Sequence, residues 1–148
     1  MESHIVNEFL RKYEKIELFL VVLFPVLAIL KFTDTFVHPV PLIFCGATLS
    51  QFSFLKTRKA GPSDRGALAI FFSKTLLTSL CLGYVTVLFQ IQAWPSWQGM
   101  SYGFLLSSII GVVGVLFVVK KPISQFLSKL ELIQLIGLFS YLIVIRIY

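Results

Sequence analysis

Charged side chains are scarce in this chain of 148 residues. They make up 14% of the sequence, whereas hydrophobic residues make up 57% and the mean hydropathy is +0.87. A soluble domain of this length needs far more polar surface, because most of its residues cannot be buried. The composition therefore argues against a soluble domain and predicts an all-α, polytopic membrane protein.

Cysteine and histidine are also scarce, with two of each. Cys45 and Cys81 lie inside apolar runs, so we expect small buried side chains and no disulfide or metal role. With only His4 and His38, the sequence shows no metal-ligand spacing and no nucleophile–base pair, and it lacks a Gly-rich phosphate loop. We therefore expect no cofactor and no enzymatic activity, because even an enzyme acting on lipid would lack its catalytic residues.

Long apolar stretches are what the chain has instead. The segment 1–15 precedes them and is amphipathic, with Ile5, Phe9 and Tyr13 on one helical face. This pattern is typical of a helix lying in the membrane interface, although a partner-binding helix has the same pattern. Segment 67–73 either lies in the interface or extends the third span. We expect five transmembrane helices, over about 16–32, 39–55, 74–91, 100–119 and 130–145.

Basic residues occur on alternate links between these stretches. The segment before the first span holds three Lys and Arg residues, the second link four and the fourth link three, whereas the other side holds Lys31 and Arg146. By the positive-inside rule the N-terminus is cytoplasmic and the C-terminus is outside, in a bacterial inner membrane. An arrangement with four spans is rejected, because it would put two basic segments on opposite sides of the membrane. Attraction to anionic lipid explains the net charge of +6, and no nucleic-acid partner is expected.

The first, third and fifth spans also begin and end alike. Lys31 follows Lys15 by sixteen residues, Gln90 follows Lys74 by sixteen, and the fifth span has a similar pair. Each of these three spans is therefore bracketed by a cation at the cytoplasmic end and a polar group at the other end. This repeat predicts two parallel helical hairpins followed by a lone fifth helix.

The link between the third and fourth spans is uncharged and contains two tryptophans. Tryptophan favours the headgroup region, and Pro95 and Gly99 break helices, so we expect a hairpin turn at the outer surface. The stretch Phe89-Gln90-Ile91-Gln92-Ala93-Trp94-Pro95-Ser96 resembles the Phe-Lys-Ile-x-His-Trp-Pro-Gly turn of GldL-like membrane proteins of Bacteroidota. Those proteins are membrane motor subunits of gliding motility and type IX secretion. Gln90, Ala93 and Ser96 replace the Lys, His and Gly of that pattern.

This resemblance implies a shared hairpin. GldL-like motors are thought to pass protons with a carboxylate inside the membrane. Here Glu17 and Glu131 closely follow the cytoplasmic lysines, and Asp34 lies in an outer link. Because no acid is expected near the centre of a span, we expect no proton-carrying role for this chain alone.

Two groups of polar residues are candidate sites. At the outer surface they are Lys31, Asp34, His38, Gln90 and Arg146, which form either a site for a headgroup, ion or partner loop, or an interfacial anchor. On the cytoplasmic side, Lys74 is expected to pair with Glu17 or Glu131. That pair is expected to hold helices together, contributing ~0.6–2 kcal/mol.

Small residues recur at four-residue spacing in three spans. Gly103, Ser107 and Gly111 share one face of the fourth span. Gly46 and Ser50 share a face of the second, and Ser79 and Gly83 share a face of the third. Such faces let another backbone approach closely, so they either pack the five helices together or dock a partner.

These observations lead to two hypotheses. The first is a non-enzymatic small subunit, or an accessory or scaffold protein, of an inner-membrane complex, whose partners are other membrane subunits or copies of itself. The alternative is a small homo-oligomeric transporter or channel with a polar site near its outer face.

Overall fold

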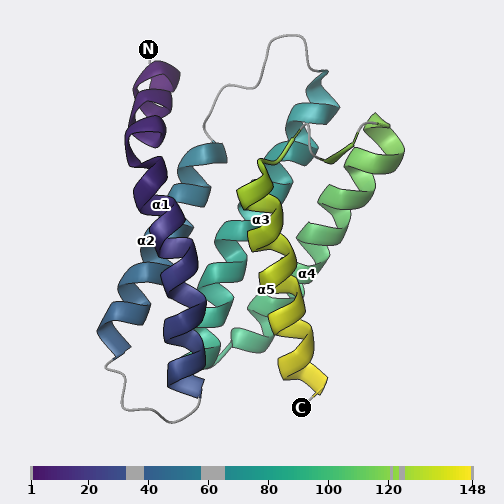
Figure 1. The fold of residues 1–148 in the computed structure, drawn as a ribbon. Helices are drawn as coiled ribbons and strands as arrows, with labels where there is room; N and C mark the ends of the chain where they lie inside the picture. Colours follow the sequence, from purple (N-terminus) through teal and green to yellow (C-terminus); the bar gives the residue numbers. More distant parts are fainter. Residues whose placement is uncertain (1, 33–38, 58–65, 121, 124–125, 148) are drawn as a thin grey trace.

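The computed structural model describes residues 2–32, 39–57, 66–120, 122–123 and 126–147, and those residues form helices and turns without strands. All five predicted helices are present (Figure 1), so the all-α prediction is confirmed. They are α1 (Glu2–Phe32), α2 (Pro39–Thr57), α3 (Ala67–Ile91), α4 (Trp97–Val113), which continues as the π-helix η1 (Gly114–Val119), and α5 (Lys129–Ile147).

Local sequence explains several of the helix boundaries. Pro39 opens α2, a position where proline is favoured because the first helical N–H has no partner within the helix. Helix α3 begins at Ala67, so the apolar segment 67–73 extends the third predicted helix. Helix α1 continues through Pro25 and includes residues 2–15 of the predicted amphipathic segment, which are therefore not a separate helix.

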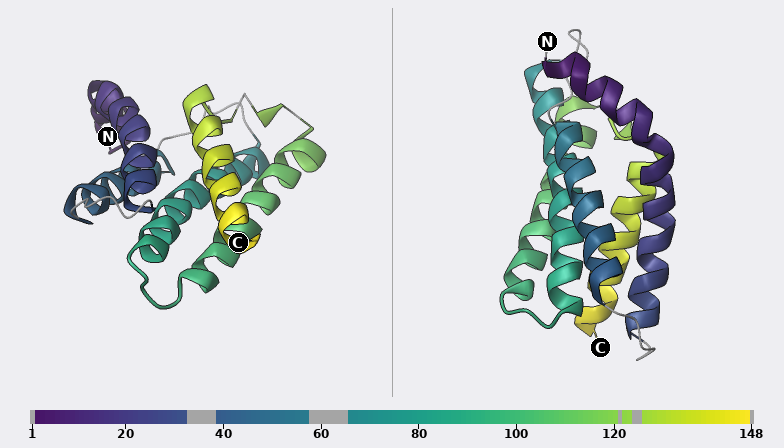
Figure 2. Two further views of the ribbon diagram at one scale, coloured as in Figure 1. Left: turned by 60° about the horizontal axis from the view of Figure 1, so that its bottom comes forward. Right: turned by 90° about the vertical axis from the view of Figure 1, so that its left-hand side faces the viewer.

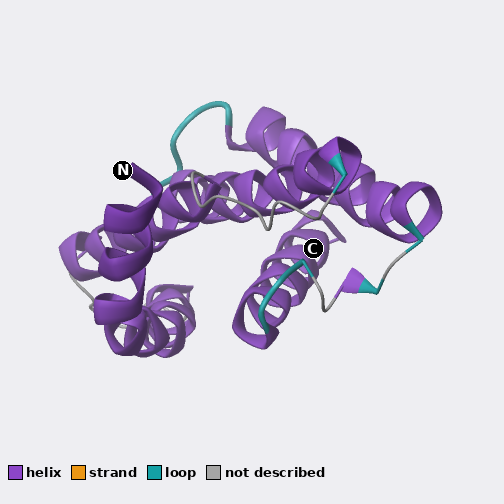
Figure 3. Cartoon of the chain, turned by 90° about the horizontal axis from the view of Figure 1, so that it is seen from above, coloured by secondary structure: helices purple, strands orange, loops and turns teal. Residues whose placement is uncertain are grey.

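The helices alternate in direction and place α3 at the centre. Helix α3 packs against α2, α4 and α5, and α1 packs mainly against α2. Seen from above in Figure 3, α1 to α4 follow one another in an arc, and α5 lies beside α3. The start of α1, the end of α2 and the start of α5 lie at one end of the molecule, opposite the α3–α4 turn (Figure 1).

The core between these helices is mainly leucine and phenylalanine. Leu42 of α2, Leu80 of α3, Phe104 of α4 and Leu142 of α5 are all fully buried. Helix α1 joins the core through Phe24, whose ring meets Tyr84 of α3 edge-on at 5.3 Å. Contributions from four helices to one core hold α3 in its central position.

The N-terminal turns of α1 lean over the end of α2. The ring of Phe9 lies 4.5 Å from that of Tyr13 and 6.3 Å from that of Phe52 on α2. Figure 2 shows α1 bending so that this part crosses toward α2. Phe9 and Tyr13, predicted to share a helical face, thus contact each other near α2.

Among the described helices, two are long and apolar enough to cross a membrane: α3 (Ala67–Ile91) and α4 with η1 (Trp97–Val119). In α1, Lys15 and Glu17 at one end and Lys31 at the other shorten the apolar run. Helices α2 and α5 have 19 residues each. On length and composition, the prediction of five spans is therefore met by two helices and not by five.

Candidate functional site

A buried cluster of three charged residues joins the middle of α1, the end of α2 and the start of α5. Nζ of Lys56 lies 2.6 Å from Oε1 of Glu17 and 3.0 Å from Oε1 of Glu131. The exposed fraction of the side chain is 14% for Lys56, 5% for Glu17 and 11% for Glu131. Burial of this kind makes a paired charge difficult to remove, because the remaining partner would be left without compensation.

Helical register brings these side chains together. Lys56 continues the inward face of α2 at three- and four-residue steps, after Leu42, Cys45, Leu49 and Ser53. Glu17 begins the buried face of α1, which continues through Leu20, Phe24 and Ala28. Glu131 begins the buried face of α5 in the same way, ahead of Leu135, Leu138 and Leu142.

Glu131 is also fixed by the start of its own helix. Its Oε2 accepts a hydrogen bond from the Ser128 N–H at 2.7 Å, and its own N–H donates to Oγ of Ser128 at 3.2 Å. This reciprocal pair is a capping box, which satisfies two N–H groups that the helix leaves free. One oxygen of Glu131 thus caps α5 while the other holds Lys56.

The electrostatics of the cluster favour a protonated lysine. Burial alone lowers the pKa of Lys56, but the adjacent Glu131 and Glu17 carboxylates outweigh it and raise the pKa above its ordinary value. A protonated amine has no lone pair with which to attack a substrate. The cluster is therefore suited to holding helices together rather than to nucleophilic catalysis.

The cation in this cluster is not the one that the sequence indicated. Lys74 lies exposed on α3 and, among the residues that the structure describes, makes no ion pair with Glu17 or Glu131. Lys56 takes that place, because α2 extends to Thr57 and carries Lys56 inward as part of the helix. Sequence reasoning assigned Lys56 to a link, although its spacing from Leu49 and Ser53 was the signal that placed it on the inward face.

The structure describes the side chains of only some of the polar residues that were predicted to meet at the outer surface. Asp34 and His38 lie outside the described residues, as does the side chain of Arg146. Lys31 lies in the last turn of α1. Gln90 accepts a hydrogen bond at Oε1 from the hydroxyl of Tyr141 at 2.8 Å, which ties α3 to α5. The predicted meeting of these five residues thus stays a prediction.

The small residues predicted to share faces lie against neighbouring helices of this chain. A Cβ added at Gly111 would lie 2.7 Å from Leu76, and one at Gly103 would lie 3.2 Å from Leu82. At Gly46 it would meet Leu88 and Phe24 at 2.8 Å. Ser50 shares a 3.0 Å hydrogen bond with Cys81, and Ser107 donates to the Phe104 carbonyl of its own helix. Gly83 of α3 likewise lies against Phe104, and a similar contact that was not expected from the sequence is that of Gly114 with Phe72.

The turn between α3 and α4 forms a second candidate site. The Trp94 N–H donates to the Phe89 carbonyl at 2.8 Å, and the rings of these two residues meet edge-on at 4.8 Å. Ala93 and Ser96 have φ values of 53° and 72°, which residues other than glycine seldom adopt. The turn encloses an open hollow of about 530 Å³.

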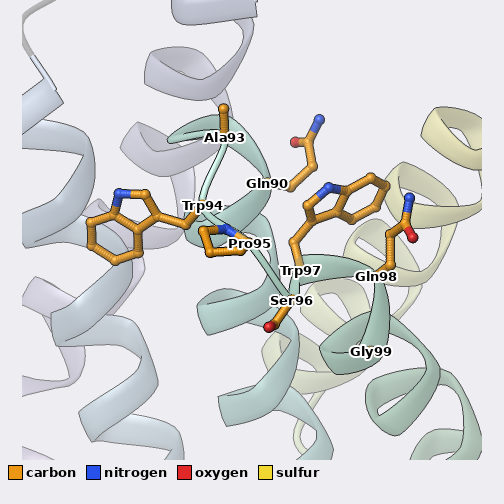
Figure 4. Close-up of a pocket in the computed structure, with 8 residues that line it drawn as sticks. All are labelled: Gln90, Ala93, Trp94, Pro95, Ser96, Trp97, Gln98 and Gly99. Atoms are coloured by element: carbon orange, nitrogen blue, oxygen red, sulfur yellow. The ribbon is translucent and has the colours of Figure 1, made fainter.

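Uncharged residues line this hollow. Figure 4 shows the Trp97 ring and the Gln90 and Gln98 side chains on one side of the turn, with Trp94 and Pro95 on the other. The lining residues are Gln90, Ala93, Trp94, Pro95, Ser96, Trp97, Gln98 and Gly99.

Comparison of the chain with known proteins gives no match: no protein-family model, no curated protein and no solved structure is similar to it.

Proposed function

We propose that this chain is a multi-pass protein of a bacterial inner membrane and serves as a non-enzymatic subunit of a membrane assembly. Large apolar side chains exposed along the outer helices support membrane embedding, since a surface of this kind is stable in lipid and promotes aggregation in water. Examples are Phe19, Val22 and Ile29 on α1, Leu106, Ile109 and Val113 on α4, and Ile133, Ile136 and Val144 on α5.

In this proposal all five helices cross the membrane, with the Glu17–Lys56–Glu131 cluster on the cytoplasmic side. The distribution of Lys and Arg supports this orientation. The shorter apolar stretches of α1, α2 and α5 are compatible with it, because long basic side chains at their ends extend toward the headgroups.

The exposed face of α5 that contains Gly137 is the observation that supports the proposal that the chain is a subunit. Gly137 lies in the middle of this helix, and a Cβ added to it would meet no atom within 4 Å. By contrast, Gly46, Gly83 and Gly111 each lie against a side chain of a neighbouring helix. Glycine weakens a helix by about 1 kcal/mol relative to alanine, so its presence on an open face favours a helix from outside the chain packing there.

Isolation of the tagged chain in a mild detergent tests this proposal. We expect native mass spectrometry to show a stoichiometric complex with another membrane protein or with a second copy. Gly137→Leu should reduce the complex at least severalfold without unfolding the chain, because the added side chain enters open space. Val113→Leu, on the exposed face of α4, is the matched control and should leave the complex intact. A monomer without partners would contradict the proposal.

A further inference from the structure

The hollow at the α3–α4 turn is rich in hydrogen-bond donors. The indole of Trp97 donates and cannot accept, and Oε1 of Gln90 is already taken by Tyr141, which leaves the Nε2 hydrogens of Gln90. A ligand that offers acceptor oxygens complements these donors.

The surface beside the hollow is apolar. Gln98 lines the hollow and heads the exposed face of α4, which continues at helical spacing through Tyr102, Leu106 and Ile109. The last three are 63%, 61% and 50% exposed. A ligand seated in the hollow therefore has an apolar face of the protein directly beside it.

We propose that the hollow binds one phospholipid molecule. The ester and phosphodiester oxygens of the lipid accept hydrogen bonds from Trp97 and Gln90. One acyl chain of the lipid lies along Tyr102, Leu106 and Ile109. A phospholipid combines acceptor oxygens at the headgroup with long apolar chains, and this combination matches the two adjoining surfaces. The inference rests on the proposed function, because it requires the turn to lie at a membrane surface.

A residue outside the hollow allows a controlled test. Trp97 lines the hollow (Figure 4), whereas Phe117, which is 72% exposed on η1, is not among the residues that line it. The full chain is reconstituted into phosphatidylglycerol vesicles, extracted gently and examined by native mass spectrometry for a retained lipid. Trp97→Phe should lower the occupancy of one bound phosphatidylglycerol about three- to tenfold, as expected for the loss of one hydrogen bond. Phe117→Leu should leave it unchanged.

Fluorescence supplies a second readout. In the Trp94→Phe variant, Trp97 is the chain's remaining tryptophan. Brominated phosphatidylglycerol, added in steps to phosphatidylcholine nanodiscs, should quench it saturably at a low mole fraction. Gln90→Leu in this background should make the quenching rise in proportion to the mole fraction. Deacylated glycerophosphoglycerol should not compete, because it lacks the acyl chains.

The outcomes separate this site from the proposed function. Equal lipid retention by Trp97→Phe and Phe117→Leu, or quenching proportional to mole fraction in a membrane-bound chain, would overturn the lipid site alone. Competition by the deacylated headgroup would overturn the assignment to an intact phospholipid. Recovery of the chain outside the membrane fraction would overturn the proposed function, and the lipid site with it.

Discussion

Nζ of Lys56 lies 2.6 Å from Oε1 of Glu17, although the two residues are 39 positions apart in the chain. The same ammonium lies 3.0 Å from Oε1 of Glu131. One side chain of α2 thereby holds α1, which packs mainly against α2, and α5, which packs against α3. The stability of this end of the molecule therefore depends on a single lysine.

Replacing this lysine tests that dependence. Lys56→Met keeps an apolar stem of similar length but leaves two buried carboxylates without a cation, so we expect a loss of about 3 kcal/mol in the free energy of unfolding. Unfolding in detergent, followed by circular dichroism, measures the change. Lys74→Met is the control, because Lys74 is exposed and should contribute little. Equal stability of the two variants would show that the cluster does not hold the helices.

The cluster also predicts how stability depends on pH. The two carboxylates raise the pKa of Lys56 above its ordinary value of 10.5 in the folded chain. The stability that Lys56 contributes is therefore complete below pH 10.5 and is lost as the pH rises through the higher folded-state pKa. The difference in unfolding free energy between the wild-type chain and Lys56→Met should be constant near neutral pH and shrink in strongly alkaline buffer. A difference that grows with alkalinity would contradict this linkage.

Replacing a glycine by alanine should have opposite effects on the stability of the chain at two positions. Gly111→Ala places a Cβ 2.7 Å from the fully buried Leu76, so the helices must separate, and we expect a loss of about 1–3 kcal/mol. Gly137→Ala places its Cβ in open space and should stabilise the detergent-solubilised chain by about 0.5–1 kcal/mol. Melting temperatures of the two variants provide the comparison, and shifts of the same sign would argue against the packing of α3 on α4.

Glycine at position 96 should stabilise the turn. Ser96 adopts a φ of 72°, a region that costs a residue with a side chain about 1–2 kcal/mol and costs glycine little. We expect Ser96→Gly to raise the unfolding free energy by about 1 kcal/mol, and Ser96→Val to lower it. If the Ser96→Gly variant were less stable than the wild-type chain, the left-handed backbone conformation of Ser96 would be incorrect.

Helix positions could be predicted from the sequence because long apolar runs and breaking residues leave few alternatives. The start of α2 at Pro39 and the turn around Pro95 were both predictable in this way. The continuity of α1 was not, because Lys15 and Glu17 suggested a membrane boundary and do not interrupt a helix. The inward extension of α2 to Lys56 was missed for a similar reason.

Side-chain pairing was harder to predict than helix positions. Lys56 and Lys74 are both basic residues near a predicted span end, and composition does not distinguish them. Only the register of each helix decides, placing Lys56 with Leu49 and Ser53 on a buried face and Lys74 on an exposed one. In the same way, the small residues of α4 offered two interpretations until Leu76 and Leu82 were seen to lie against them.

Cysteine accessibility most directly tests the central claim, that the chain spans a membrane with the Lys56 end inside and the α3–α4 turn outside. In a background without Cys45 and Cys81, single cysteines replace Gly66 and Gly99, two exposed glycines with open space around them. A membrane-impermeant maleimide should label Gly99→Cys in intact cells, after the outer membrane is made permeable. It should label Gly66→Cys only after the inner membrane is opened. Equal labelling of both positions in intact cells, or recovery of the chain in the soluble fraction, would contradict the account.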